Sequence, residues 1–308
     1  MNGNNRPRAV ISLGTNSTRF LIVRDSDGAR VEQLERGSIG TRLGEGLGER
    51  GQLVASAMER TLGAITQFMG RIRDHDAAVS CIATSAMRRA SNAEHFIKRV
   101  RDVTSASLQI LEGHEEAQDS FTGATYEAPL AANGRVVVID VGGGSTECAV
   151  GRAGQLEDAI SLEIGAVRLA ELFPATMGAT PADEARTGGR NARQYAATIA
   201  EDVSRYAPIT EAVAVGGTPL TLGAIAWASN VDDVSGRILP RHDIDDCIER
   251  MLALDLNRRR SMPGMIAQRA DILPAGAIIL SETLRALHAE SVTLRENDLL
   301  LGYLLRTR

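Results

Sequence analysis

The stretch "AVISLGTNSTRFLIV", residues 9–23, consists of an apolar run, a short polar turn and a second apolar run. Apolar runs rich in β-branched residues on both sides of a turn with Gly and Asn predict two paired strands. The stretch "VVVIDVGGGSTECAV", residues 136–150, has the same design. When Ser12 is aligned with Asp140, the glycines that open the two turns coincide. The sequence therefore contains one strand–turn–strand pattern twice.

Both turns are rich in Gly, Ser, Thr or Asn, which expose backbone N–H groups and hydroxyls. Such turns form anion-binding nests, and phosphate is their usual ligand. The alternative is a pair of ordinary hairpins with glycine in the turn. Two matching copies, each after a β-rich run, favour phosphate.

Composition limits the class of protein. The chain has 308 residues, enough for about two domains. A net charge of −5 and an aromatic content of 3% argue against nonspecific nucleic-acid binding, so no DNA partner is expected. The first residues lack the apolar core of a signal peptide, and no apolar run approaches the roughly 20 residues of a membrane span. No membrane association is expected.

The cysteines and lysines restrict the chemistry. Cys81, Cys148 and Cys247 are far apart and form no CxxC pair, which argues against a disulfide framework or a zinc site and fits a cytoplasmic location. Lys98 is the only lysine, and there is no GxxxxGK[ST] motif. P-loop NTPase and Schiff-base chemistry are therefore disfavoured. Arginines must supply nearly all the positive charge at any phosphate site.

The chain alternates strand and helix patterns. The segment 36–53 reads as a Gly-rich loop with Arg42 and Glu45, Asn92 is expected to cap a helix over 93–103, and "PLAANG", residues 129–134, reads as a hinge. Further helices are predicted over 54–73, 112–128 and 181–206, strands over 77–86 and 105–111, a strand, Gly-Gly-Thr turn and helix over 211–229, and a mainly helical tail from 275.

These motifs, in this order, resemble the exopolyphosphatase / guanosine pentaphosphate phosphatase family of the actin-like ATPase superfamily. The matching pieces cover nearly the whole chain: "SLGTNSTRFLIV", "TRLGEGL", "ATSAMRRASNAEHF", "LEGHEEA", "VIDVGGGSTE", "SLEIGAVRLAE", "AVGGTPLTL" and "MPGMIAQRADILPAGAIIL". The resemblance implies an α/β fold of two actin-like (ribonuclease H-like) domains with a cleft between them. We expect domain I over 1–126, domain II over 127–296, and a C-terminal helix over 297–308 that packs back on domain I.

The resemblance also implies Mg²⁺-dependent hydrolysis of phosphoric anhydrides, with release of terminal phosphate from inorganic polyphosphate or guanosine pentaphosphate. The sequence does not choose between these substrates, and it leaves a homodimer open. A sugar or acetate kinase on the same fold is a third interpretation, and the "GHEEA" motif argues against it.

Glu116, in "GHEEA", matches the family's catalytic glutamate, which orients and activates the attacking water. Without the other motifs, this residue would read as an acid that stabilises a helix N-terminus. We expect Glu115 to have that helix-start role and His114 to be a surface residue.

Asp140 and Glu147 match acidic residues of the family near the magnesium and its waters, although Glu147 can also be read as an outward-facing strand residue. Arg88 matches a family arginine that pairs with phosphate oxygens, and Arg19 is a further candidate. The loop residues expected to hold phosphate are Thr15, Asn16 and Ser17, then Gly142, Gly143, Gly144, Ser145 and Thr146, and finally Gly216, Gly217 and Thr218, whose glycines can also serve tight strand–helix packing.

Ser12 departs from the family, whose first loop reads Asp-Leu-Gly with a metal-binding Asp. Serine keeps one oxygen but loses the charge, so metal affinity and rate are expected to suffer. Two interpretations follow: a working phosphohydrolase, and a catalytically impaired protein that binds or senses polyphosphate or guanosine polyphosphate. Retention of Glu116, Asp140, Arg88 and the "GGGST" loop favours the enzyme.

Overall fold

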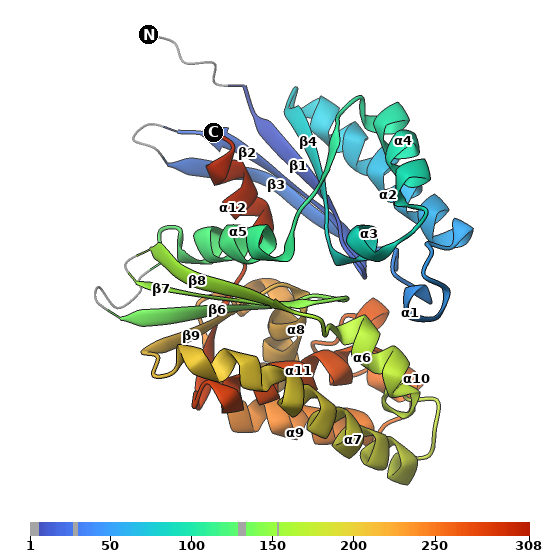
Figure 1. Ribbon diagram of the computed structural model, residues 1–308, viewed down its shortest axis with the longest axis vertical. Coiled ribbons are helices and arrows are strands. Elements are labelled where there is room, and N and C mark those ends of the chain that lie inside the picture. Colours follow the sequence, from blue (N-terminus) through green and yellow to red (C-terminus); the bar gives the residue numbers. More distant parts are fainter. Residues whose placement is uncertain (1–5, 27–29, 129–133, 153) are drawn as a thin grey trace. The chain divides into compact units, whose positions relative to one another are not determined.

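The computed structural model describes residues 6–26, 30–128, 134–152 and 154–308 (Figure 1). Its contacts divide the chain into two compact units, Met1–Glu116 with Leu300–Arg308, and Ala117–Leu299. Each unit has its own sheet with helices, which confirms the predicted α/β class. The boundary between the units falls inside one helix, α5 (Gly113–Thr125). The sequence-based ranges, 1–126 and 127–296, stay a prediction.

The sheet of the first unit has the strand order β3-β2-β1-β4-β5. Strand β1 (Arg8–Leu13) pairs antiparallel with β2 (Ser17–Asp25) and parallel with β4 (Ala78–Ala83). The outer strands are β3 (Val31–Gly40), antiparallel to β2, and β5 (Leu108–Ile110), parallel to β4. The accompanying helices are α1 (Leu47–Arg50), α2 (Ala55–Asp74), α3 (Ser85–Arg89), α4 (Ala93–Thr104) and, from the end of the chain, α12 (Leu299–Arg306).

The first hairpin is formed as predicted, and it carries the core of this unit on one face. Alternate residues of a strand point to the same side, so Phe20 and Ile22 of β2 both enter the cluster formed with α2. The Phe20 ring lies 4.6 Å from the Phe68 ring of α2, measured between centroids. The C-terminal helix is tied to the same sheet, because Arg8 Nη1 donates to the carbonyl of Leu304 at 2.6 Å.

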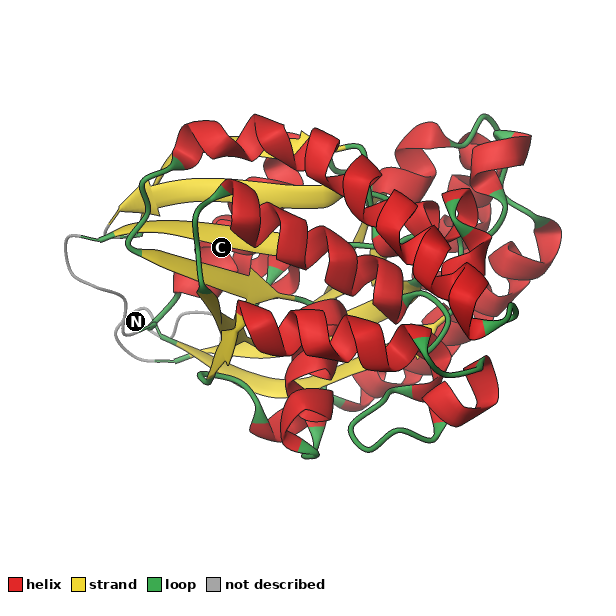
Figure 2. Cartoon of the chain, turned by 90° about the horizontal axis from the view of Figure 1, so that it is seen from below, coloured by secondary structure: helices red, strands yellow, loops and turns green. Residues whose placement is uncertain are grey.

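The sheet of the second unit has the strand order β10-β11-β9-β6-β7-β8. Strands β6 (Arg135–Val141), β7 (Thr146–Arg152) and β8 (Gln155–Leu162) form an antiparallel meander. Strands β9 (Glu211–Val215) and β11 (Ser291–Arg295) continue the sheet in parallel, and β10 (Ile238–Pro240) ends it antiparallel. The helices (red in Figure 2) are α6 (Ala166–Leu172), α7 (Ala182–Ala200), α8 (Gly217–Trp227), α9 (Arg241–Leu252), α10 (Leu256–Arg260) and α11 (Leu273–Ala286), with 3₁₀ turns η2 (Pro174–Met177), η3 (Glu201–Tyr206), η4 (Val231–Asp233) and η5 (Ala267–Arg269).

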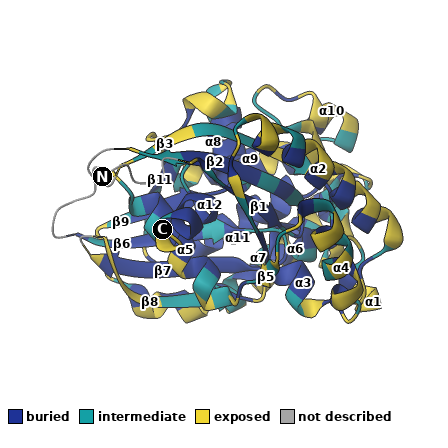
Figure 3. Ribbon diagram, turned by 90° about the horizontal axis from the view of Figure 1, so that it is seen from above, coloured by how far each residue is buried: buried dark blue, intermediate teal, exposed yellow. Residues whose placement is uncertain are grey.

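Strand β6 is buried on both faces, which positions the second hairpin (Figure 3). Val137 and Ile139 face the main core, which α7, α9 and α11 cover on one side of the sheet (Figure 1). Val136 and Val138 face a second cluster, to which α5 contributes Ala117, Phe121 and Ala124. A strand buried on both faces reads as a continuous apolar run, which explains "VVVIDV".

Several local predictions are confirmed, among them the second hairpin, helix α2, strand β4 and the acidic first turn of α5. Two are wrong. Asn92 precedes α4 but does not cap it, because its side-chain amide pairs with both N and O of Leu53 at 2.9 Å each. The start of the predicted Gly-rich loop belongs to β3, where the missing side chain of Gly37 leaves room for the Phe20 ring. The predicted hinge falls almost entirely outside the described residues.

None of the helices in the described part of the chain is long and apolar enough to span a membrane.

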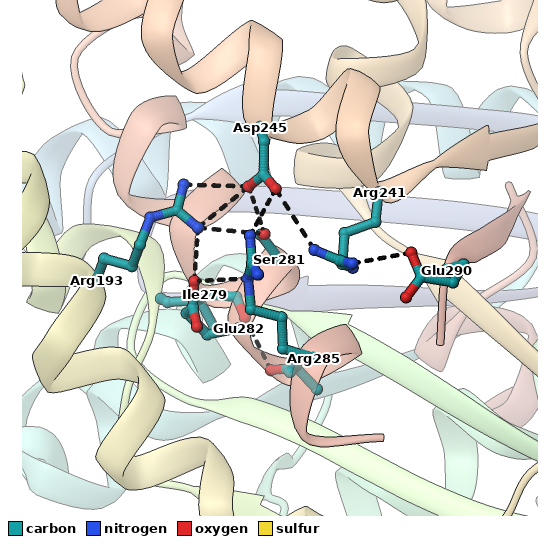
Figure 4. A network of polar contacts seen from close by, with 9 residues as sticks. Arg193, Arg241, Asp245, Ile279, Ser281, Glu282, Arg285 and Glu290 are labelled. Atoms are coloured by element: carbon teal, nitrogen blue, oxygen red, sulfur yellow. Dashed lines mark hydrogen bonds and ion pairs between the residues drawn. The ribbon is translucent and has the colours of Figure 1, made fainter. Parts of the chain in front are cut away.

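An ion network joins the helices of the second unit (Figure 4). Asp245 of α9 accepts hydrogen bonds from Arg193 of α7 at 3.1 Å, and from Ser281 and Arg285 of α11 at 2.6 and 2.8 Å. Arg193 also pairs with Glu282 at 2.6 Å. Burial raises the pKa of Asp245, but the hydrogen bond from Ser281 and the charge of Arg193 outweigh it and leave the pKa below its ordinary value.

We expect Asp245→Asn to lower the free energy of unfolding at pH 7 by about 1–3 kcal/mol, between the values for exposed and buried ion pairs. Because folding lowers the pKa of Asp245, its stabilisation is present above about pH 4 and is lost as the pH falls through the folded pKa. Urea denaturation should therefore show a smaller difference between the two proteins at pH 3 than at pH 7. Asp183→Asn, on the exposed side of α7, is the control and should change stability little at either pH. A difference that does not depend on pH would contradict this account.

Candidate active site

Hydrogen bonds from the segment after β3 fix the carbonyl groups of the turn that follows β1. The carbonyls of Thr15 and Asn16 accept hydrogen bonds from Gly44 N and Arg42 N, each at 2.9 Å. Within the described chain, the amides of Thr15 and Asn16 have no hydrogen-bond acceptor. Gly44 is required for this close approach, since a side chain there would overlap Thr15. The first predicted phosphate loop thus presents free N–H groups.

Two buried oxygens near this turn also lack a partner among the described residues. They are Asn16 Oδ1 and Ser85 Oγ, the latter at the start of α3. The amide of Thr84, the residue before α3, donates to Leu13 O at the end of β1, which brings α3 next to the turn. Because buried polar atoms are normally hydrogen-bonded, this pair of oxygens is available to a ligand. Sequence reasoning did not identify Ser85.

Arg88 of α3 and Glu116 of α5 form an ion pair. The same nitrogen of Arg88, Nη1, also donates to the carbonyl of Leu111 at 2.6 Å. Both side chains are largely buried, Glu116 at 7% and Arg88 at 15% exposed. The predicted base and the predicted phosphate-binding arginine are therefore in direct contact.

The neighbours of Glu116 have the roles predicted for them. Glu115 Oε2 accepts a hydrogen bond from Glu112 N at 2.8 Å, which satisfies an amide at the start of α5. His114 is exposed. Glu116 is therefore the buried carboxylate in the first turn of this helix, and Glu115 is the one that caps it.

In the second unit, Asp140 and Glu147 are cross-strand neighbours on β6 and β7. Directly opposed residues of paired strands point to the same face. Each carboxylate accepts from a serine hydroxyl: Asp140 Oδ2 from Ser120 at 3.0 Å, and Glu147 Oε1 from Ser161 at 2.8 Å. The two predicted metal ligands thus lie together, each oriented by a neighbouring side chain.

The Gly-rich turn between these strands is held like the first one. The carbonyls of Gly142 and Gly143 accept from the amides of Ala166 and Val167 at the start of α6, each at 2.9 Å. Among the described residues, the amides of Gly143, Gly144 and Ser145 have no acceptor. Gly165 packs directly under the turn, since an added Cβ would lie 2.5 Å from the backbone of Gly143.

The third predicted loop lies beside Asp140. Gly216 has a φ of +87°, and a Cβ there would lie 2.9 Å from Asp140 Oδ1. A Cβ at Gly217 would overlap the guanidinium of Arg269, which therefore lies at the N-terminus of α8. A cation and helix amides at one point suit an anion. Arg269 lies in one of the motifs that carry the resemblance, but sequence reasoning did not single it out.

Two predicted threonines use their hydroxyls for the fold. Thr146 Oγ1 donates to Ile164 O at 2.6 Å and the residue is fully buried, because it begins strand β7. Thr218 Oγ1 donates to Val141 O at 3.3 Å. Both hydroxyls thus donate their proton within the fold, and a phosphate contact of either residue stays a prediction. Arg19 lies opposite Ser12 across the β1–β2 ladder, and Ser17 starts β2.

Few side chains in the described part of the chain are placed to bind a metal ion. The described residues contain no group of three or more His, Cys, Asp or Glu side chains placed to hold a metal ion. Asp140 and Glu147 nevertheless fit Mg²⁺, which takes hard oxygen ligands, uses one or two carboxylates and keeps several waters. Cys148 follows Glu147 in β7, and burial, with the charges of Glu147 and Asp140, raises the pKa of its thiol. It is therefore no candidate nucleophile or metal ligand.

Comparison with known proteins identifies related chains. The model of the Ppx/GppA phosphatase family matches residues 21–307. Exopolyphosphatase 2 of Mycobacterium tuberculosis is 32% identical over 317 residues, covering 96% of this chain and 96% of that protein. The guanosine-5'-triphosphate,3'-diphosphate pyrophosphatase of Vibrio vulnificus is 27% identical over 297 residues, covering 95% of this chain and 57% of that protein.

A crystal structure of the Aquifex aeolicus member of the Ppx/GppA protein family matches with a TM-score of 0.80 and 25% identity, covering 98% of this chain and 97% of that one. This match confirms the predicted fold of two actin-like domains.

Proposed function

We propose that the chain, which belongs to the Ppx/GppA phosphatase family, releases terminal phosphate from inorganic polyphosphate or guanosine pentaphosphate, with a water activated by Glu116 and with Mg²⁺ as cofactor. It is a hydrolase of phosphoric anhydrides. The family relatives named above are an exopolyphosphatase and a guanosine pentaphosphate pyrophosphatase, and both substrates end in the same phosphoanhydride.

The turn between β6 and β7 is the feature that supports this proposal most strongly. This turn, between the strands that present Asp140 and Glu147, has amides at Gly143, Gly144 and Ser145 that find no acceptor among the described residues. Amides bind phosphate oxygens, while carboxylates repel them unless a cation intervenes. The arrangement therefore suits a metal–phosphate group better than either a free anion or a free metal ion.

In the proposed reaction, Glu116 accepts a proton from water as the water oxygen attacks the terminal phosphorus. The bond from that phosphorus to the bridging oxygen breaks, and orthophosphate and a shortened chain are the products. Arg88 pairs with Glu116 in the structure. We propose that the terminal phosphate, which carries more negative charge than a carboxylate, draws Arg88 toward it, so that Glu116 can contact the water.

Asp140 and Glu147 are the proposed Mg²⁺ ligands, through carboxylate oxygens and bound waters. When bound, Mg²⁺ would neutralise charge on the phosphate oxygens. The amides of the two turns and the guanidinium of Arg269 would hold the remaining oxygens of the substrate. Neither Ser145 nor Thr15 needs its side chain for this role, because the amide is the donor.

The test is phosphate release from long-chain polyphosphate and from guanosine pentaphosphate, each with Mg²⁺ and with EDTA. The proposal requires Mg²⁺-dependent release from at least one substrate. ATP-dependent phosphorylation of sugars or acetate without any release of phosphate from these substrates would contradict it.

Ser12 supports a second candidate function, a protein that binds the same substrates with little turnover. Its position on β1 corresponds to that of Asp140 on β6, so the first turn lacks the carboxylate that the second has. A bound polyphosphate with slow release under saturating Mg²⁺ would favour this candidate.

We expect Ser12→Asp to raise the rate of phosphate release and to lower the Mg²⁺ concentration at half-saturation, each by roughly tenfold, because a charged hard oxygen is added near the cation. Ser12→Asn, which has the same shape without the charge, should give neither gain. A Mg²⁺ titration of the three proteins decides the question. A fully active wild type that is indifferent to Ser12→Asp would show that the first-turn acid is dispensable here.

A further inference from the structure

One buried hydroxyl of helix α5, that of Ser120, donates its hydrogen bond outside the helix. Ala117, Phe121 and Ala124 pack into the cluster against β6, β7 and β9. Ser120 lies three residues after Ala117, on the same stripe, and is 2% exposed. A core stripe of this kind needs no polar side chain, so the contact that Ser120 makes is informative.

A serine or threonine in a helix commonly donates to the carbonyl four residues earlier. Two threonines of α5 do so: Thr122 donates to Gln118 O at 2.9 Å and Thr125 to Phe121 O at 2.8 Å. Ser120 does not. A hydroxyl has one proton to donate, and that of Ser120 goes to Asp140 Oδ2 at 3.0 Å.

Because Ser120 binds Oδ2 of Asp140, the position of the second carboxylate oxygen, Oδ1, is also fixed. Asp140 Oδ1 lies beside Gly216, 2.9 Å from the position that a Cβ there would take. The carboxylate is therefore held by Ser120 through Oδ2, while Oδ1 faces the backbone of Gly216. Glu116 lies one turn before Ser120 on the same helix.

We propose that Ser120 is a positioning residue, which orients the carboxylate of Asp140 for the metal. This inference rests on the proposed function, because it assigns Asp140 to the cation. Hydrogen-bond partners of metal ligands commonly change metal affinity or activity by about 10–100-fold when they are removed.

The experiment compares wild type with Ser120→Ala, Ser120→Thr and Thr122→Ala. Mn²⁺ binding is measured by the electron paramagnetic resonance of free Mn²⁺, in the presence of saturating inorganic phosphate. We expect Ser120→Ala to weaken Mn²⁺ binding about tenfold, and Ser120→Thr, which keeps the hydroxyl, to restore much of it. Thr122→Ala, which loses a hydroxyl that donates to Gln118 O of its own helix, should bind Mn²⁺ as wild type does.

Thermal unfolding in EDTA distinguishes a loss of metal binding from a loss of folding stability. Alanine is a better helix former than serine, so Ser120→Ala should unfold at nearly the wild-type temperature without metal. Equal Mn²⁺ affinity in wild type and Ser120→Ala would overturn the proposal, as would a wild type that binds no Mn²⁺. A wild type that binds Mn²⁺ but releases no phosphate would contradict the proposed hydrolase instead, and the affinities of the variants would still decide the role of Ser120.

Discussion

Glu116→Gln is expected to reduce the rate of phosphate release by about 10²–10⁴-fold, the usual effect of losing a positioned general base. The substitution keeps the shape of the side chain and the capacity to accept a hydrogen bond from Arg88. It removes the ability to take a proton from water. Substrate binding should therefore change much less than turnover.

Single-turnover phosphate release and direct binding of polyphosphate should both be measured for this variant. Glu115→Gln is the matched control, one residue away in the same first turn. The carboxylate of Glu115 accepts a hydrogen bond from Glu112 N. Loss of its charge should lower the free energy of unfolding by about 1 kcal/mol or less and leave turnover nearly unchanged. Equal activity in wild type and Glu116→Gln would show that Glu116 serves only the helix start and the contact with Arg88.

The two hairpins could be predicted because their information is local and repeated. An apolar run, a Gly-containing turn and a second run specify paired strands without reference to the rest of the chain. The role of Glu115 was predictable for the same reason, since a helix start is defined within four residues. The resemblance to a family then supplied the assignment of Glu116, which its local sequence would not have favoured over Glu115.

The residues that sequence reasoning missed are defined by contacts between distant segments. Ser120 is separated by 20 residues from Asp140, its acceptor, and nothing in "AQDSFTG" indicates where the hydroxyl points. Arg269 lies within a family motif, but its position at the start of α8 depends on the packing of Gly217. Tertiary contacts of this kind also explain the wrong predictions, because the amide of Asn92 found a better match in the backbone of Leu53 than in its own helix.

The free amides of the second turn depend on a residue outside it, Gly165. The turn approaches the start of α6 so closely that Ala166 and Val167 donate to the carbonyls of Gly142 and Gly143. These bonds fix the orientation of the peptides and leave the opposite side, with its amides, for a ligand. An added Cβ at residue 165 would lie 2.5 Å from Gly143 C, Gly143 O and Gly144 N, too close for any side chain.

Gly165→Ala is therefore expected to displace the turn and to lower kcat/KM for phosphate release by about 10²-fold, the effect that a shift of roughly 1 Å in a catalytic group can have. Overpacking should also lower the free energy of unfolding by about 1–3 kcal/mol. Gly63→Ala, on the exposed side of α2 with open space around the new methyl group, is the control and should stabilise the protein by about 0.5–1 kcal/mol without affecting activity. Steady-state kinetics and urea denaturation of both variants test this. Wild-type kcat/KM in a folded Gly165→Ala protein would show that the amides of this turn do not bind the substrate.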